Sequence, residues 1–226
     1  MLNSRKFWKT ILLVMTTASI AFLYGCGPRE EDDFFSDSEF TDRDAISEIT
    51  PQERIEQYKQ ILEIDPSDYQ VRNNLGVIYA QLRLLEEAIE QFKMVIETKP
   101  DYNTAILNLG AAYGDMGQLD NAIESFKKAI EVNPGYAKAY QNLGVAYYET
   151  KQYEQAIDSF EKFIALQTVP IDESIYYTIA QSYKNLKNKE MVRQYLEKAL
   201  EVNPNNEQIK ENLLNIDIFM TELDNQ

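Results

Sequence analysis

The feature that most constrains this chain is a proline that returns at nearly constant spacing. Pro66, Pro100, Pro134, Pro170 and Pro204 are separated by 34, 34, 36 and 34 residues, and the intervals between them carry similar sequences. Self-similarity at one fixed period indicates a stack of similar structural units, because each unit must bury its apolar face against the next. The chain is therefore expected to fold as a repeat array.

Each interval carries apolar residues at the same offsets. In the first interval Leu75 and Tyr79 lie four residues apart, as do Ala88 and Phe92, so that each pair shares one face of a helix. Small residues fall where two helix axes must approach closely, and the proline ends the second helix because it has no N–H group to donate. Each unit is thus predicted to be two antiparallel helices. The positions recur as Leu109, Tyr113, Ala122 and Phe126, as Leu143, Tyr147, Ala156 and Phe160, and in weaker form as Ile179, Tyr183, Val192 and Leu196.

This 34-residue pattern resembles the tetratricopeptide repeat, and the resemblance extends over residues 51–223. It implies an all-α, right-handed superhelical solenoid of antiparallel helix pairs, with an N-terminal half repeat and a C-terminal capping helix. The expected divisions are a half repeat at 51–68, repeats at 69–102, 103–136, 137–172 and 173–206, the last of them degenerate, and a capping helix at 207–226.

The start of the array and one irregularity within it can be placed. Thr50 can cap a helix while Glu53 returns a hydrogen bond, and Pro51 suits the first helical position. In the third repeat the proline arrives two residues late. The segment 165–169 must therefore form either an extended helix end or a loosened loop.

Composition excludes several classes of function. The net charge of −15 repels phosphate backbones, so nucleic acid is not an expected partner. The chain has no histidine and a single cysteine, which excludes disulfides, Cys/His zinc sites and Ser-His or Cys-His catalysis. Its carboxylates occur on outward helix faces and as loop pairs such as Glu86–Glu87, with no apolar pocket to separate their pKa values. We therefore expect that the protein is not an enzyme and that it binds no metal ion or cofactor.

Residues 1–25 read as an export signal. A basic stretch with Arg5, Lys6 and Lys9 precedes an uncharged run from Thr10 to Tyr24, which is shorter than the roughly 20 residues that a spanning helix needs. The run ends in Leu-Tyr-Gly-Cys, which resembles a bacterial lipobox and implies that Cys26 carries a lipid anchor. The alternative is an uncleaved signal anchor. Both place the repeats in the bacterial cell envelope, and Gly27, after the cysteine, favours by resemblance the outer membrane of a diderm.

Residues 26–50 form an acidic stretch with too little apolar surface to fold, so a disordered tether is expected. The alternative is that Phe34, Phe35 and Phe40 of this stretch form a short docking motif.

The first helix of each pair lines the concave face in tetratricopeptide solenoids, and the resemblance implies a peptide-binding groove there. Asn74, Asn108 and Asn142 form one amide per repeat, and amides can pair with the backbone of an extended peptide. The alternative is that these amides only contact solvent. The other predicted groove residues are Val77, Ala111, Lys138, Val145, Tyr148 and Tyr177.

The final helix raises a second hypothesis. Leu214 and Ile218 project away from the apolar stripe of this helix, where they are either scattered surface residues or an interface for a weak homodimer. Taken together, the sequence predicts a membrane-tethered scaffold that binds a peptide segment or helix of a protein partner. The alternative is a self-associating structural protein of the envelope.

Overall fold

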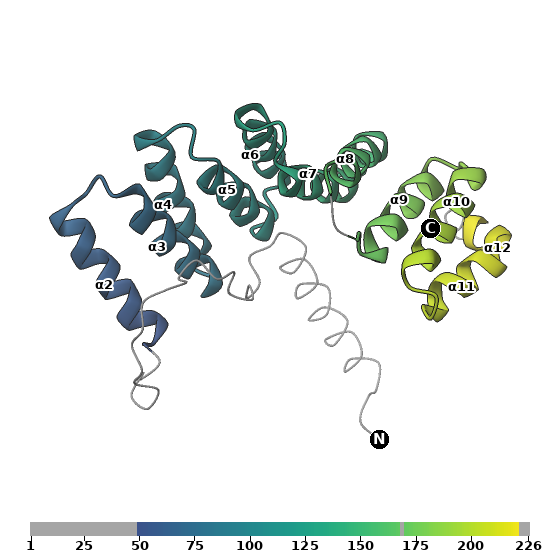
Figure 1. Ribbon diagram of the computed structural model, residues 1–226, viewed down its shortest axis with the longest axis horizontal. Helices are drawn as coiled ribbons and strands as arrows, with labels where there is room; N and C mark the ends of the chain where they lie inside the picture. The colour runs from purple at the N-terminus through teal and green to yellow at the C-terminus, as the bar shows by residue number, and fades with distance from the viewer. Residues whose placement is uncertain (1–48, 168–169, 222–226) are drawn as a thin grey trace, which may run out of the picture. The chain divides into compact units, whose positions relative to one another are not determined.

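The computed structural model describes residues 49–167 and 170–221, and every regular element within these ranges is an α-helix (Figure 1). None of the helices in these ranges is long and apolar enough to cross a lipid bilayer. The predicted lipid site Cys26, the export signal 1–25 and nearly all of the tether 26–50 lie outside the described residues. The described helices form two compact units that meet in sequence at Ser125 and Phe126.

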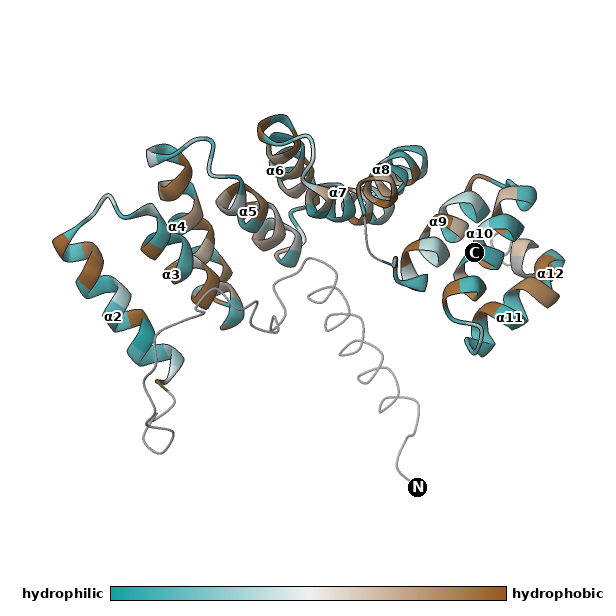
Figure 2. Cartoon of the chain, in the orientation of Figure 1, coloured by the Kyte–Doolittle hydropathy of each residue, from teal (hydrophilic) through white to brown (hydrophobic). Residues whose placement is uncertain are grey.

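Helix pairs follow one another as the repeat predicts. Each first helix has 13 residues and each second helix has 14. Apolar residues run in stripes between polar ones along these helices (Figure 2). The first helices are α3 (Tyr69–Gln81), α5 (Asn103–Asp115), α7 (Ala137–Glu149) and α9 (Glu173–Asn185), and the second helices are α4 (Leu85–Thr98), α6 (Leu119–Val132), α8 (Tyr153–Leu166) and α10 (Lys189–Val202).

The array opens on a single helix, α2 (Pro51–Ile64), which packs against α3. Its predicted capping box is present: the Thr50 hydroxyl accepts from the backbone N–H of Glu53 at 3.2 Å, and the Glu53 carboxylate accepts from the backbone N–H of Thr50 at 2.8 Å. These hydrogen bonds lower the pKa of Glu53. Ile55 of α2 is buried against Leu75 and Ile78 of α3, so the half repeat covers the apolar face that α3 would otherwise expose.

In the first unit, the core forms where α3, α4 and α5 meet. Ala88 and Phe92 of α4 are fully buried together with Ala80 and Ala112. Gly76 lies so close to the Phe92 ring that an added Cβ atom would be 2.7 Å from its Cε1 atom. The predicted close approach of the two helices at this glycine is thus confirmed.

The second unit repeats this packing between α7 and α8. Phe160 is fully buried, and a Cβ atom on Gly144 would lie 2.8 Å from the ring. In α10 the equivalent positions hold Val192 and Leu196, which are also fully buried. The degenerate repeat therefore keeps the core positions with different side chains.

The turn inside every pair contains one residue with left-handed backbone. These residues are Arg83, Gly117, Lys151 and Lys187, with φ between 57° and 74°. Only Gly117 carries the sequence signature of this conformation, since glycine has no Cβ atom to clash. The other three adopt it because the repeat fixes the turn.

The extra residues of the third repeat lie in a connection and not in a helix. Helix α8 ends at Leu166 with the same length as the other second helices, and Gln167 after it is extended at φ −83° and ψ 139°. The two additional residues therefore lengthen the loop before α9. Of the two expected forms, the extended helix end is not found, because α8 ends at Leu166.

Lysine–tyrosine contacts join successive repeats. The ammonium groups of Lys93 and Lys127 each lie 5.6 Å from the ring centre of a tyrosine in the following first helix, Tyr113 and Tyr147 respectively. The third repeat has Glu161 at this position, and its carboxylate accepts a 2.8 Å hydrogen bond from the Tyr195 hydroxyl of α10. The hydrogen bond thus links α8 to α10 across the lengthened loop.

The predicted single capping helix is divided in two, α11 (Glu207–Leu214) and α12 (Ile216–Thr221). Asn215 between them leaves the helical region at φ −104° and ψ 38°, and asparagine has low helix propensity because its side chain competes for backbone hydrogen bonds. Lys189 of α10 pairs with Asp217 in the first turn of α12. Both segments still pack against α10, so the cap is retained in two pieces.

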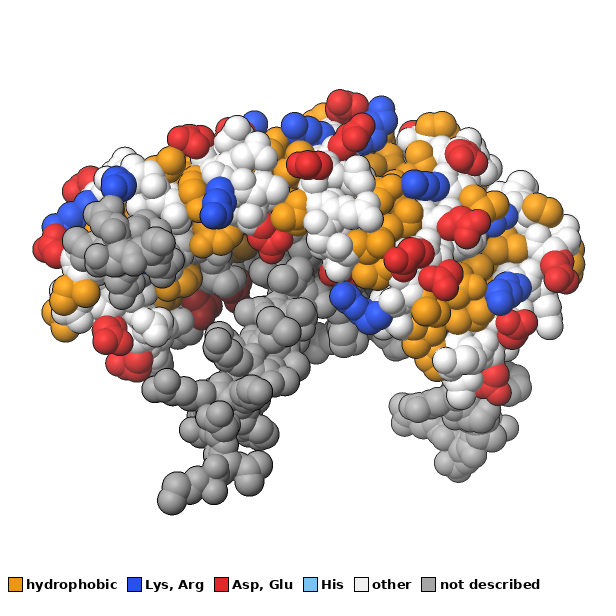
Figure 3. Space-filling model, turned by 180° about the vertical axis from the view of Figure 1, so that it is seen from behind, with side chains coloured by type: hydrophobic (Ala, Val, Ile, Leu, Met, Phe, Trp, Pro, Cys, Tyr) orange, Lys and Arg blue, Asp and Glu red, His pale blue; other side chains and the backbone are white. Residues whose placement is uncertain are grey.

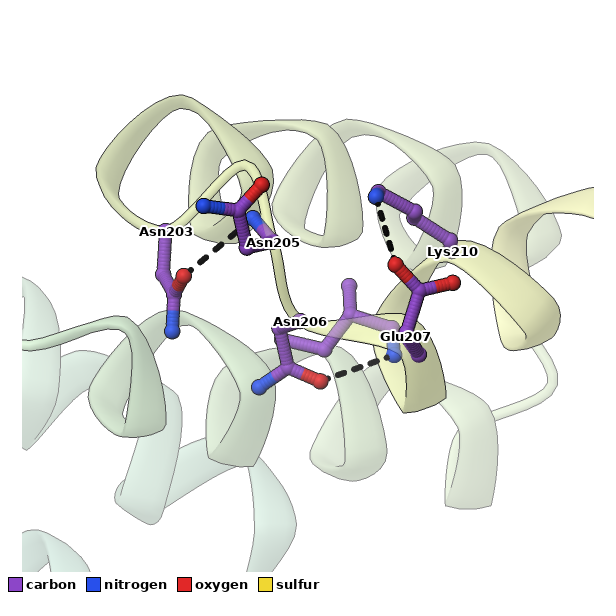
Figure 4. Close-up of polar contacts among 6 residues, drawn as sticks. Asn203, Asn205, Asn206, Glu207 and Lys210 are labelled. Atoms are coloured by element: carbon purple, nitrogen blue, oxygen red, sulfur yellow. Dashed lines mark hydrogen bonds and ion pairs between the residues drawn. The ribbon is translucent and has the colours of Figure 1, made fainter.

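Asparagine side chains fix the point where α11 begins (Figure 4). The Asn203 side chain accepts a hydrogen bond from the backbone N–H of Asn205, and the Asn206 side chain accepts one from the backbone N–H of Ile209, both at 3.2 Å. Ile209 is buried. This start sets which side chains of α11 turn toward α9.

Candidate functional site on the first helices

The predicted groove positions lie on one side of α3 and α5 in the first unit and of α7 and α9 in the second. We call these two surfaces the first-helix faces. Their amides are not equivalent: Asn74 is exposed, Asn108 is half-buried and Asn142 is fully buried. A fully buried side chain cannot reach a bound peptide, so the predicted row of three accessible amides is wrong at Asn142.

Asn108 is held by a residue that the prediction did not single out. Its Nδ2 atom donates to Oδ1 of Asn73, one repeat earlier, at 3.3 Å. Asn73 is buried, so this amide pair crosses from α5 to α3 and orients Asn108. The spacing of 35 residues, close to the repeat length, is the signal in the sequence that could have identified this pair.

Several other predicted groove residues pack inside the protein. Ala111 and Val145 are buried, whereas Val77 and Lys138 are half-buried. The Lys138 ammonium donates to the Gln141 side chain at 3.1 Å. Only some of the predicted groove residues are therefore accessible on the first-helix faces.

An ion pair lies at the C-terminal end of α5, beside the first-helix face of the first unit. Arg83 Nη1 lies 3.0 Å from Oδ2 of Asp115, and the Asp115 side chain is only 1% exposed. Burial raises the pKa of Asp115, and the nearby Arg83 opposes this shift. Arg83 reaches from the turn of one repeat to the first helix of the next.

In the second unit, polar side chains of α9 and α11 converge on Tyr177. Its hydroxyl oxygen accepts from Nε2 of Gln181 at 2.8 Å and from Nδ2 of Asn212 at 3.1 Å. Gln208 then donates through Nε2 to Oδ1 of Asn212 at 3.2 Å. Gln208 and Asn212 were not predicted from the sequence, although Asn212 lies three residues after Ile209, on the side of the helix that faces the protein.

Tyr148 of α7 lies beside this group. Its ring contacts Tyr153 edge to face, with 5.9 Å between ring centres. Burial, and then the neighbouring Tyr153 and Tyr177, raise the pKa of Tyr148. The phenol is therefore protonated at neutral pH and can donate a hydrogen bond.

The two apolar residues singled out on the last helix are exposed. Leu214 is 83% exposed at the end of α11, and Ile218 is 64% exposed in α12. Their outward placement agrees with the sequence. The break at Asn215 puts them in different helices, so they do not form an i, i+4 pair on one continuous helix.

The surface shown in Figure 3 carries acidic and basic side chains interspersed with apolar ones, without one large charged patch. Within the part of the chain that the structure describes, no cluster of cysteine and carboxylate ligands could hold a metal ion.

Comparison with known families gives matches over most of the helical region. Family models described as tetratricopeptide repeat match residues 57–90, 101–168 and 173–206. These segments contain the pairs α5–α6, α7–α8 and α9–α10 in full, together with α3 and the beginning of α4. No curated protein matches this chain.

Solved structures show the same fold. A crystal structure of MamA protein is 30% identical over 67% of this chain and 81% of its own, with a TM-score of 0.62. MamA from Desulfovibrio magneticus RS-1 is 20% identical over 70% of this chain and 88% of its own, with a TM-score of 0.63. YrrB, described as a repeat protein with an unusual peptide-binding site, is 19% identical over 71% of this chain and 82% of its own, with a TM-score of 0.63.

Proposed function

Because the chain belongs to the tetratricopeptide repeat family, we propose that it is a protein-interaction scaffold whose first-helix faces bind a peptide segment or helix of a partner. The observation that carries the proposal is the chemistry of the accessible side chains on each of the two first-helix faces. Asn74, Asn108, Tyr148 and Tyr177 are uncharged side chains that donate or accept hydrogen bonds and are at least partly exposed. Such groups suit a peptide backbone. The peptide-binding site described for YrrB supports the same use of this fold.

A scaffold of this kind does not require catalytic residues. Among the described residues, the buried carboxylate of Asp115 has Arg83 as its charged partner and not a second carboxylate, so an acid–base pair of carboxylates is not formed there. We therefore propose a binding protein and not an enzyme.

We further propose that a lipid on Cys26 tethers the scaffold in the bacterial envelope, through the acidic stretch 26–50. This rests on the basic, uncharged and Leu-Tyr-Gly-Cys segments of the sequence. Cells grown with an alkynyl fatty acid should label the wild type and not the Cys26→Ser variant. Equal labelling of both proteins, or a mature N-terminus elsewhere than Cys26, would rule out the lipid anchor.

Self-association is the second candidate, and the exposure of Leu214 and Ile218 is the observation that favours it. Light scattering on the purified full-length protein distinguishes the two. A dimer that the double variant Leu214→Glu, Ile218→Lys converts to a monomer would assign these residues to a homotypic interface. The other outcome is that the wild type is a monomer and that the double variant recovers the same partners from membranes. That result would refute self-association and support the scaffold function.

A further inference from the structure

The hydrogen bonds around Tyr177 all run in one direction. The Gln208 amide donates to Asn212, and this turns the amide nitrogen of Asn212 toward the phenol. Gln181, one turn along α9, donates to the same oxygen. Two donors therefore occupy the oxygen of Tyr177.

A phenol has one proton to donate and accepts at most two hydrogen bonds. Because Gln181 and Asn212 fill the acceptor positions of Tyr177, its O–H bond must point away from both amides. No residue in the described part of the chain accepts this proton. The side chain is half-buried, so an external acceptor can reach it.

A second phenol stands beside it with its donor equally unused. The hydroxyl of Tyr148 has no hydrogen-bond partner among the described residues, and its raised pKa keeps it protonated at neutral pH. Tyr148 comes from α7 and Tyr177 from α9, so the two donors belong to consecutive repeats.

We propose that Tyr177 is the central donor of a subsite for a main-chain carbonyl of an extended peptide, with Tyr148 as a second donor. This inference rests on the proposed function and locates its binding site in the second unit. The hydrogen-bonded group contains only amides and phenols, which match a neutral acceptor. Carbonyls on one side of an extended chain recur about every 7 Å, so one peptide presents several acceptors along the same side.

The test uses full-length protein in detergent and peptides selected on it from a display library. The selected peptide, synthesised with blocked ends, is the probe for calorimetry. Tyr177→Phe keeps the ring and removes the hydroxyl, and should weaken binding about tenfold, the effect of one lost hydrogen bond at the upper end of its range. Tyr183→Phe is the matched control, because Tyr183 lies on the same helix but stacks on Tyr195, with 5.6 Å between ring centres. It should bind as the wild type does.

A thioamide scan of the peptide identifies the acceptor, since sulfur accepts hydrogen bonds more weakly than oxygen. One thioamide should weaken binding to wild type but not to Tyr177→Phe. Unchanged affinity in Tyr177→Phe would refute the subsite and leave the scaffold proposal standing. Failure to select any peptide would count against both. A peptide that binds only with a free C-terminal acid would show that the acceptor is a terminal carboxylate and refute the main-chain assignment.

Discussion

A Cβ atom added to Gly144 of α7 would lie 2.8 Å from the ring of Phe160 in α8. Carbon atoms in relaxed contact are about 3.5–4.0 Å apart. Phe160 is fully buried, so its ring cannot swing into solvent to make room. The same relation holds between Gly76 and Phe92 in the other unit, which shows that the glycine and the phenylalanine of the repeat form one packing element.

The first prediction is that Gly144→Ala destabilises the protein by about 1–3 kcal/mol, the usual cost of overpacking a core. A shift in the urea midpoint of unfolding measures it. Gly135→Ala is the control, since Gly135 is exposed and an added Cβ atom would lie 3.4 Å from its nearest neighbour, the Asn133 side chain. Equal midpoints for the two variants would show that the Gly144–Phe160 contact is not tight.

The second prediction concerns the left-handed residue of each turn. Lys151→Gly should stabilise the protein by up to about 1 kcal/mol, because glycine avoids a left-handed cost of about 1–2 kcal/mol but loses more backbone entropy on folding. Gly117→Ala should have the opposite effect, and there the added Cβ atom meets nothing within 4 Å, so only the backbone conformation contributes. Thermal unfolding of both variants measures the changes. Shifts of the same sign would contradict the turn assignment.

The third prediction is a pH dependence from Asp115, whose pKa is raised by burial. The folded protein holds this proton more tightly than the unfolded chain, whose aspartates titrate near pH ~3.9. Stability therefore falls as pH rises from that value through the folded pKa, and the loss persists above it. Urea unfolding should show that wild type loses stability relative to Asp115→Asn across this window.

Arg83 provides the control for this titration. Because Arg83 lowers the pKa of Asp115, Arg83→Gln should move the fall in stability to a higher pH. A wild-type stability that instead rises with pH relative to Asp115→Asn would mean that the ion pair outweighs the cost of burial.

The fold could be predicted from the sequence because its determinants are local and repeated. Ala88, Phe92 and Phe160 recur at fixed offsets, and the structure buries each of them completely. The capping box at Thr50 was equally readable, since all of its groups lie within four residues. The left-handed turns at Lys151 and Arg83 were not, because lysine and arginine carry no signal for that conformation.

The candidate site was less predictable because accessibility depends on contacts that the repeat does not encode. Asn74 and Asn142 hold the same repeat position, yet one is exposed and the other fully buried. Asn212 reaches Tyr177 from outside the repeats, and only the folded structure brings these two residues together. The break at Asn215 likewise reflects the local preference of one residue within an otherwise regular apolar pattern.

We propose that the first-helix faces of a membrane-tethered protein bind a protein partner. The most direct measurement places a photo-crosslinking amino acid at exposed Asn74 on α3 in cells, and for comparison at exposed Glu90 on α4. We expect a discrete crosslinked partner from position 74 in the membrane fraction, none from position 90, and loss of the membrane-bound product when Cys26→Ser is added. Crosslinks of equal yield from both positions, or no crosslink from position 74, would contradict the proposal.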